Sequence, residues 1–131
     1  HHQAPTCPKA MLTGHQTNET TLELMRRAWC VSVPSIWEEP FGMVAAEAHM
    51  QGVPVIASQV GGLAEILDDG ETGYYAPPGH IQRHAERLNT IFSSRRQTIE
   101  TGLAAHQHAA RTFNRKIFAE KTEALLLQIS K

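Results

Sequence analysis

Two glutamates in the segment SIWEEPFGMVAAEAHMQGVPVIAS (residues 35–58) have the residue type and spacing for ligand chemistry. Glu47 lies in the small apolar run VAAEA, which is typical of a buried helix, where a charge without a partner is costly. Glu39 stands eight positions earlier and is followed by PFG. Eight residues of helix span roughly 12 Å, whereas the paired carboxyls of a glycosidase lie within about 10 Å of each other. The spacing therefore suits a longer ligand, with hydroxyls at both ends and charge in the middle, such as a nucleotide diphosphate sugar.

The residues between the two glutamates predict an anion site at the start of a helix. Pro40 suits the first helical position, where a missing N–H is harmless, and Glu39 would then lie at the cap. The N–H groups of Gly42, Met43 and Val44 would have no partner inside the helix. Together with the helix dipole they favour a bound anion such as phosphate.

Strands and helices are expected to alternate along the chain. Apolar runs predict strands at residues 10–14, 30–35, 53–58 and 74–76. Helical spacing or composition predicts helices at residues 20–29, 40–51, 61–67, 80–93, 95–112 and 114–130. Strands that are apolar throughout and separated by helices indicate an α/β fold with a parallel sheet covered on both faces. Such sheets bind ligands at the carboxyl ends of their strands, which places the EPFG corner at the candidate site.

Length and composition bound the fold and exclude several partners. A chain of 131 residues is expected to form one domain or part of one. We expect strand–helix units at residues 10–79 and C-terminal helices at residues 80–131. The net charge of -1 argues against a nucleic-acid partner, and no apolar run has the length of a membrane span. Cys7 and Cys30 do not make a disulfide framework, so a cytoplasmic location is expected.

Five segments resemble, in order and spacing, the retaining glycosyltransferases of family 4, which have the GT-B fold and an E-x7-E motif: VSVPSIWEEPFG, EPFGMVAAE, AHMQGVPVIAS, GGLAEIL and DGETGYYAPPG. The resemblance covers residues 11–92 well and the final helix loosely. It implies a partial C-terminal half of such an enzyme, a Rossmann-like domain that binds a UDP-, GDP- or ADP-hexose without a metal or another cofactor. The hexose would pass to the hydroxyl of an acceptor, which the sequence does not identify, with its anomeric configuration retained.

The resemblance also implies a role for each residue of the motif. Glu39 would be the catalytic residue and would contact the hydroxyls of the transferred sugar. Four residues would line the donor sugar and the diphosphate through backbone groups: Phe41, Gly42, Met43 and Val44. Glu47 would bind the ribose.

Members of that family also have parts that this sequence does not match. These are an N-terminal, acceptor-binding domain and two more strand–helix units, whose basic residues grip the diphosphate. Between Arg27 and Arg83 the chain has no lysine or arginine, but it has seven acidic residues. We therefore expect weak nucleotide binding and no transferase activity from this chain alone. Membrane association through an N-terminal domain is the alternative to a purely cytoplasmic location.

The resemblance has a consequence for the sheet. In such sheets the strands, numbered along the chain, lie in the order 3-2-1-4-5-6, so strands 1 and 2 separate strand 3 from strand 4. A chain that supplies only the last four strands would lack strands 1 and 2. Residues 10–14 would then lose their neighbours, and residues 30–35 would form an exposed apolar edge. We expect either direct pairing of these two strands or a homodimer, formed through the edge or by exchange of the N-terminal segment.

Other readings of the same residues stay open. One is a non-catalytic, Rossmann-like interaction module, and another is a GT-B epimerase of nucleotide-linked sugars, which EPFG fits less well. The glycine pair at residues 61–62 would either bind phosphate or form a tight turn. The pairs His80/His84 and His106/His108 lack the third ligand of a zinc helix, so no metal site is expected.

Overall fold

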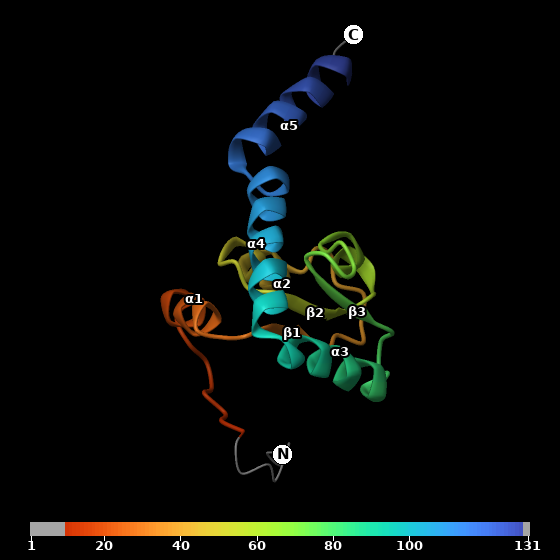
Figure 1. Ribbon diagram of the computed structural model, residues 1–131. Helices are drawn as coiled ribbons and strands as arrows, with labels where there is room; N and C mark the ends of the chain where they lie inside the picture. The colour runs from red at the N-terminus through yellow and green to blue at the C-terminus, as the bar shows by residue number, and fades with distance from the viewer. Residues whose placement is uncertain (1–9, 130–131) are drawn as a thin grey trace.

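Three parallel strands form the centre of the molecule, which a computed structural model describes for residues 10–129 (Figure 1). The strands β1 (Val31–Val33), β2 (Val55–Ser58) and β3 (Gly73–Ala76) lie in the order β1-β2-β3. The register pairs Val31 with Val55 in the first ladder and Val55 with Gly73 in the second. Every residue of β2 and β3 is buried. The parallel sheet predicted from the apolar runs is therefore confirmed.

Helices cover both faces of this sheet. They are α1 (Asn18–Arg26), α2 (Met43–Met50), the 3₁₀ helix η1 (Gly61–Glu65), α3 (Ile81–Ser93), α4 (Arg95–Thr112) and α5 (Arg115–Ile129). On one face, Val55, Ala57 and Tyr75 share a core with residues of α2 and η1. On the other face, Ile56 and Tyr74 belong to a core that includes a residue of α3. Successive strand residues thus alternate between two cores, as the pleat of a strand requires.

The C-terminal part of the chain is helical, as predicted. α4 packs along α2, and α5 extends away from the body of the molecule (Figure 1). Ser94 caps α4, because its hydroxyl accepts a hydrogen bond from the Gln97 N–H at 3.3 Å. No residue of α5 is buried. Among residues 10–129, no helix combines the length and the apolar character needed to traverse a lipid bilayer.

The strand predicted at residues 10–14 is not present. These residues have no regular structure, and the side chains of Met11 and Leu12 are 84% and 74% exposed. The predicted pairing of this segment with β1 is therefore wrong. An apolar segment forms a strand only where it pairs with a neighbour, and residues 10–14 make no ladder with the open edge of β1.

β1 lies at the edge of the sheet, as predicted for the strand at residues 30–35. The Val31 N–H donates a hydrogen bond to the Pro54 carbonyl at 3.0 Å. Because backbone groups alternate in direction along a strand, the N–H and C=O of Ser32 point to the open side of the sheet. The Ser32 hydroxyl lies 2.7 Å from Nε2 of His84 in α3. This edge thus presents backbone groups that another strand can pair with.

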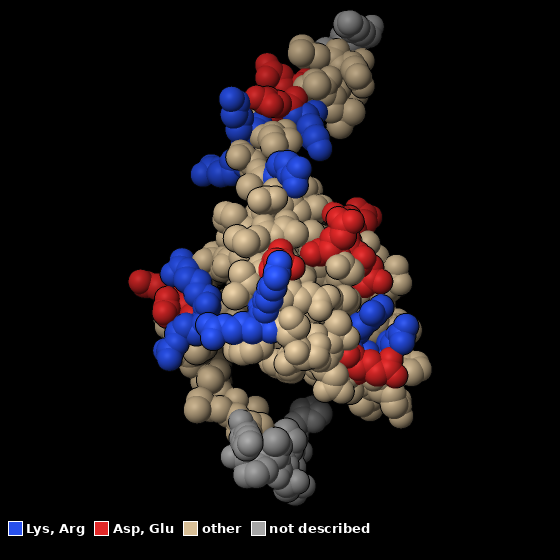
Figure 2. Space-filling model, viewed as in Figure 1, with Lys and Arg blue, Asp and Glu red and all other residues tan. Residues whose placement is uncertain are grey.

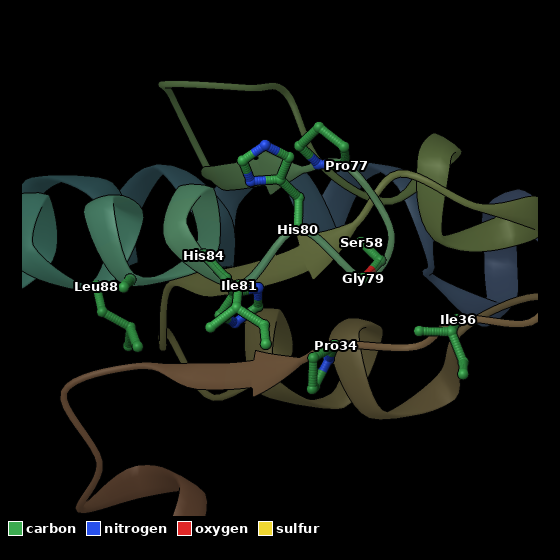
Figure 3. Close-up of a pocket in the computed structure, with 10 residues that line it drawn as sticks. Pro34, Ile36, Ser58, Pro77, Gly79, His80, Ile81, His84 and Leu88 are labelled. Atoms are coloured by element: carbon green, nitrogen blue, oxygen red, sulfur yellow. The ribbon is translucent and has the colours of Figure 1, made fainter.

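A hollow of about 420 Å³ lies beyond the carboxyl ends of the strands, on the side of α3 (Figure 3). Pro34, Ser58 and Pro77 contribute to it from the ends of the three strands, while α3 contributes Ile81 and Leu88. Neither glutamate of the motif lines it. The hollow is therefore separate from the motif residues described next.

Candidate functional site

The loop between β1 and α2 holds the first glutamate of the motif in a fixed position. Glu39 is half-buried there, and its carboxylate accepts a hydrogen bond from the Ser35 hydroxyl. Its backbone carbonyl accepts a second hydrogen bond from the Gly62 N–H at 2.7 Å. Glu39 is thus fixed both by its own loop and by the backbone of η1.

The glycine pair at residues 61–62 packs directly against this loop. A Cβ atom on Gly61 would lie 2.5 Å from the Glu39 carbonyl oxygen, and one on Gly62 would lie 2.5 Å from Phe41 Cα. Backbone atoms at this distance leave room for glycine alone. Of the two roles that the sequence left open for the pair, these contacts support close packing in a tight turn.

α2 begins later than the sequence predicted. Its N-cap is Gly42, whose φ of 88° lies in the left-handed region, and Pro40 lies in the preceding loop. The predicted start at Pro40, with Glu39 as the cap, is therefore wrong, because a glycine with positive φ turns the chain into the helix. The Met43 and Val44 N–H groups have no hydrogen-bond partner within residues 10–129. They are available to an anion, which the helix dipole also favours.

Glu47 is half-buried and borders a second hollow, of about 960 Å³. Phe41 and Met43 line the same hollow from the loop and the first turn of α2. The Glu47 carboxylate has no hydrogen bond or ion pair in the described part of the chain. Glu39 does not line this hollow. The structure therefore brings Glu47 together with the start of α2, but it does not bring the two glutamates into one hollow.

The opposite wall of this hollow comes from the end of α4 and from α5. Phe113, Arg115 and Lys121 contribute to it. The Phe113 ring meets the Phe41 ring edge-on, with centroids 5.7 Å apart and planes at 88°. Sequence reasoning did not connect these residues with the motif. The available signal was the absence of basic residues between Arg27 and Arg83, which leaves an anion site without a cation from its own region.

A histidine pair, with one ring buried and the other half-buried, lies between α2 and α4. His49 is fully buried, and neither of its ring nitrogens has a hydrogen-bond partner within the described residues. Burial and, to a smaller extent, His108 lower the pKa of His49 from 6.5 to about 4, against opposing effects of the Thr72 backbone and Asp68. The two imidazole centroids lie 6.3 Å apart, and His108 Nδ1 is 3.1 Å from Asp68 Oδ2. Sequence reasoning considered His108 only as a metal ligand and missed His49.

Residues 5–112 match the family model described as glycosyl transferases group 1. This chain belongs to that family. The match spans the sheet, the motif loop and the helices up to the end of α4. The resemblance to GT-B glycosyltransferases seen in the sequence is therefore confirmed at the level of family and fold.

Two curated relatives illustrate the range of this family. A D-inositol 3-phosphate glycosyltransferase of Nocardia farcinica is 38% identical over 95 residues, which are 72% of this chain and 21% of that protein. A glycogen synthase of Mycobacterium tuberculosis is 31% identical over 114 residues, which are 87% of this chain and 27% of that protein. The group 1 glycosyl transferase chain described here thus spans less than a third of the length of either relative.

Solved structures of longer proteins superimpose on this group 1 glycosyl transferase chain. Sucrose-phosphate synthase from Thermosynechococcus elongatus has a TM-score of 0.80 at 32% identity, covering 88% of this chain and 29% of that one. The Anabaena protein HepE in complex with UDP has a TM-score of 0.77 at 29% identity, covering 81% and 29%. The C-terminal domain of a group 1 family protein from Francisella tularensis, with a TM-score of 0.72 at 23% identity, covers 79% and 53% and shares the fold.

Proposed function

We propose that this chain is the donor-binding part of a retaining glycosyltransferase, which transfers a hexose from a nucleotide diphosphate sugar to an acceptor hydroxyl. The start of α2 carries the proposal, because two N–H groups without partners lie beside the hollow that Glu47 borders. The structural neighbour HepE is described in complexes with UDP and with UDP-glucose. A UDP-hexose is therefore the donor to test first, ahead of GDP- and ADP-hexoses.

Each residue of the motif has a place in this proposal. Glu39 contacts the hydroxyls of the transferred sugar from the loop beyond the carboxyl end of β1, and it is the proposed catalytic residue. Four residues bind the sugar and the diphosphate through their backbone: Phe41, Gly42, Met43 and Val44. Glu47 accepts hydrogen bonds from the ribose diol. No metal or other cofactor takes part in the proposed reaction.

We expect the isolated chain to bind UDP with a Kd of about 1 mM or weaker and to transfer no sugar. Backbone N–H groups and a helix dipole contribute only about 0.3–1 kcal/mol each. An amide-resolved NMR titration with UDP measures the affinity and locates the site through shifts at Met43, Val44 and Glu47. A micromolar Kd would contradict the weak binding, and unchanged signals at the start of α2 would contradict the site.

The role of Glu47 has a sharper test in a pair of ligands. The Glu47→Ala chain is expected to lose the preference for UDP over 2′-deoxy-UDP, because a carboxylate–hydroxyl hydrogen bond worth about threefold to tenfold in affinity is removed. Glu71→Ala alters an exposed turn and provides the matched control, which should keep the preference. An unchanged preference in the Glu47→Ala chain would exclude a ribose contact of this residue.

We also propose that two copies of this chain associate through the β1 edge, with exchange of the N-terminal segment as the alternative route to a homodimer. Ser32→Pro is expected to reduce self-association, since it deletes the N–H that points to the open side and spares the ladder with β2. Ser32→Ala removes the same hydroxyl contact with His84 but keeps the N–H, so it should associate like the wild type. Light scattering over a concentration series measures the molar mass of each chain in solution. A wild type that stays monomeric at every concentration would refute the dimer.

A cytoplasmic location is part of the proposal as well. Cys30 is a half-buried free thiol, and burial raises its pKa above the usual value, which keeps the thiol protonated and unreactive. Cys7 lies outside the described residues. Membrane association through a preceding domain stays a separate prediction.

A further inference from the structure

The hollow beside the start of α2 is lined by two acidic and two basic side chains: Glu47, Glu65, Arg115 and Lys121. In the described part of the chain, none of these four side chains has an ion-pair partner within 4.0 Å. By contrast, Lys116 of the same helix α5 is paired, since it lies 4.0 Å from Glu120. The cations of the hollow are thus available to an anionic ligand.

We propose that Arg115 and Lys121 bind the diphosphate of the donor, an inference that rests on the donor site proposed at α2. The motif region has no cation of its own, because no lysine or arginine occurs between Arg27 and Arg83. The N–H groups at the start of α2 offer partial charges only, whereas a diphosphate carries full negative charges. α5 adds two full positive charges, and a guanidinium can form two parallel hydrogen bonds with one phosphate group.

The corner between α4 and α5 is held by an aromatic contact against the loop of residues 34–42, between β1 and α2, which we call the donor loop. Phe113 packs edge-on against Phe41 of the loop, and its centroid lies 6.1 Å from that of His108. Ile117, one turn into α5, is half-buried and also lines the hollow. Figure 2 shows lysine and arginine side chains gathered around the beginning of α5, where this helix leaves the body of the molecule. These contacts hold the beginning of α5 beside the hollow, which Arg115 and Lys121 line together with Met43 of α2.

The mixed charge of the hollow indicates the class of ligand. Carboxylates such as Glu47 and Glu65 accept hydrogen bonds from hydroxyls, while Arg115 and Lys121 attract phosphate groups. A ligand with both kinds of group, such as a nucleoside diphosphate or its sugar ester, satisfies all four side chains. A polyanion without hydroxyls near its charges would meet repulsion from the two glutamates.

Paired titrations with UDP and uridine test this inference in the 131-residue chain. Arg115→Ala and Lys121→Ala are each expected to weaken UDP binding about fivefold, the upper range for an exposed ion pair, and to leave uridine binding unchanged. Lys116→Ala is the matched control on the same helix, because Lys116 pairs with Glu120 and does not line the hollow. Since no residue of α5 is buried, all three variants should give the amide spectrum of the wild type.

The outcomes separate this inference from the proposed function. Wild-type UDP affinity in both variants would overturn the role of α5 and leave the site at α2 in place. An equal loss of UDP and uridine affinity would also overturn it, because uridine has no phosphate for a cation to bind. Absence of any UDP-dependent shift at Met43 and Val44 in the wild type would overturn the donor site itself, and the inference with it.

Discussion

Replacing Gly62 with alanine is expected to lower the free energy of unfolding by about 1–3 kcal/mol, the usual cost of an overpacked interior. The new methyl group would lie 2.5 Å from Phe41 Cα and from the Pro40 carbonyl oxygen. Backbone atoms cannot yield as a flexible side chain does, so the donor loop has to move. The hydrogen bond from the Gly62 N–H to the Glu39 carbonyl would be strained in the same movement.

The same substitution should therefore affect ligand binding as well as stability. Urea denaturation measures the stability, and the NMR titration with UDP measures the affinity. Ala64→Ser is the control, because Ala64 is an exposed residue of the same 3₁₀ helix and substitutions at such positions change stability by less than about 0.5 kcal/mol. If the Gly62→Ala chain had the unfolding free energy and the UDP affinity of the wild type, the close packing of η1 on the donor loop would be wrong.

Local patterns were sufficient to predict most of the elements. The apolar run of β2 and the turn residues around it predict a buried strand, and the structure has one at Val55–Ser58. The predicted helix at residues 95–112 has the bounds of α4, and in the structure the Ser94 side chain caps its first turn. Residues 10–14 were misassigned because a strand depends on its neighbour, and the neighbour is not part of the local sequence.

The start of α2 was misplaced for a related reason. A proline is a good first residue of a helix, so Pro40 is the local prediction. The structure delays the helix to Met43 because the Glu39 carbonyl is bound by Gly62 and Gly42 takes a positive φ. The Glu39 carbonyl contacts Gly62, and Gly42 packs closely against Leu63, so both features depend on the later element η1. The local sequence around Pro40 gives no information on the packing of η1 against this loop.

The site was predictable where its residues are contiguous and not where distant elements meet. The motif from Glu39 to Glu47 is one segment, and its chemistry follows from its order. Arg115 and Lys121 reach the same hollow only because of the turn at Phe113. His49 had a usable signal, since it lies one helical turn after Ala45 on the buried face of α2. A histidine on such an apolar face is a buried polar group that the sequence alone can flag.

Replacing His49 with methionine is expected to stabilise the protein, and most strongly in acid. At neutral pH the gain is about 1–3 kcal/mol, because two buried ring nitrogens without hydrogen-bond partners are removed. The pKa of His49 is about 4 in the folded chain and near 6.5 in the unfolded chain. As the pH falls through this window, the unfolded chain takes up a proton that the folded chain does not bind. Stability of the wild type is therefore lost between pH 6.5 and pH 4, by about 3 kcal/mol in total.

The difference in unfolding free energy between the wild type and the His49→Met chain isolates the effect of His49 from that of the other titrating groups. His108 and Asp68 face His49 and are present in both proteins, as are all other carboxyls. Urea denaturation at half-unit steps from pH 4 to pH 8 should show a gap that is constant above pH 6.5 and widens below it. His15→Met, at an exposed position, should instead follow the wild type throughout. A gap of constant size across the whole range would mean that His49 takes up its proton equally in both states. The loss of stability in acid would then have to come from other groups.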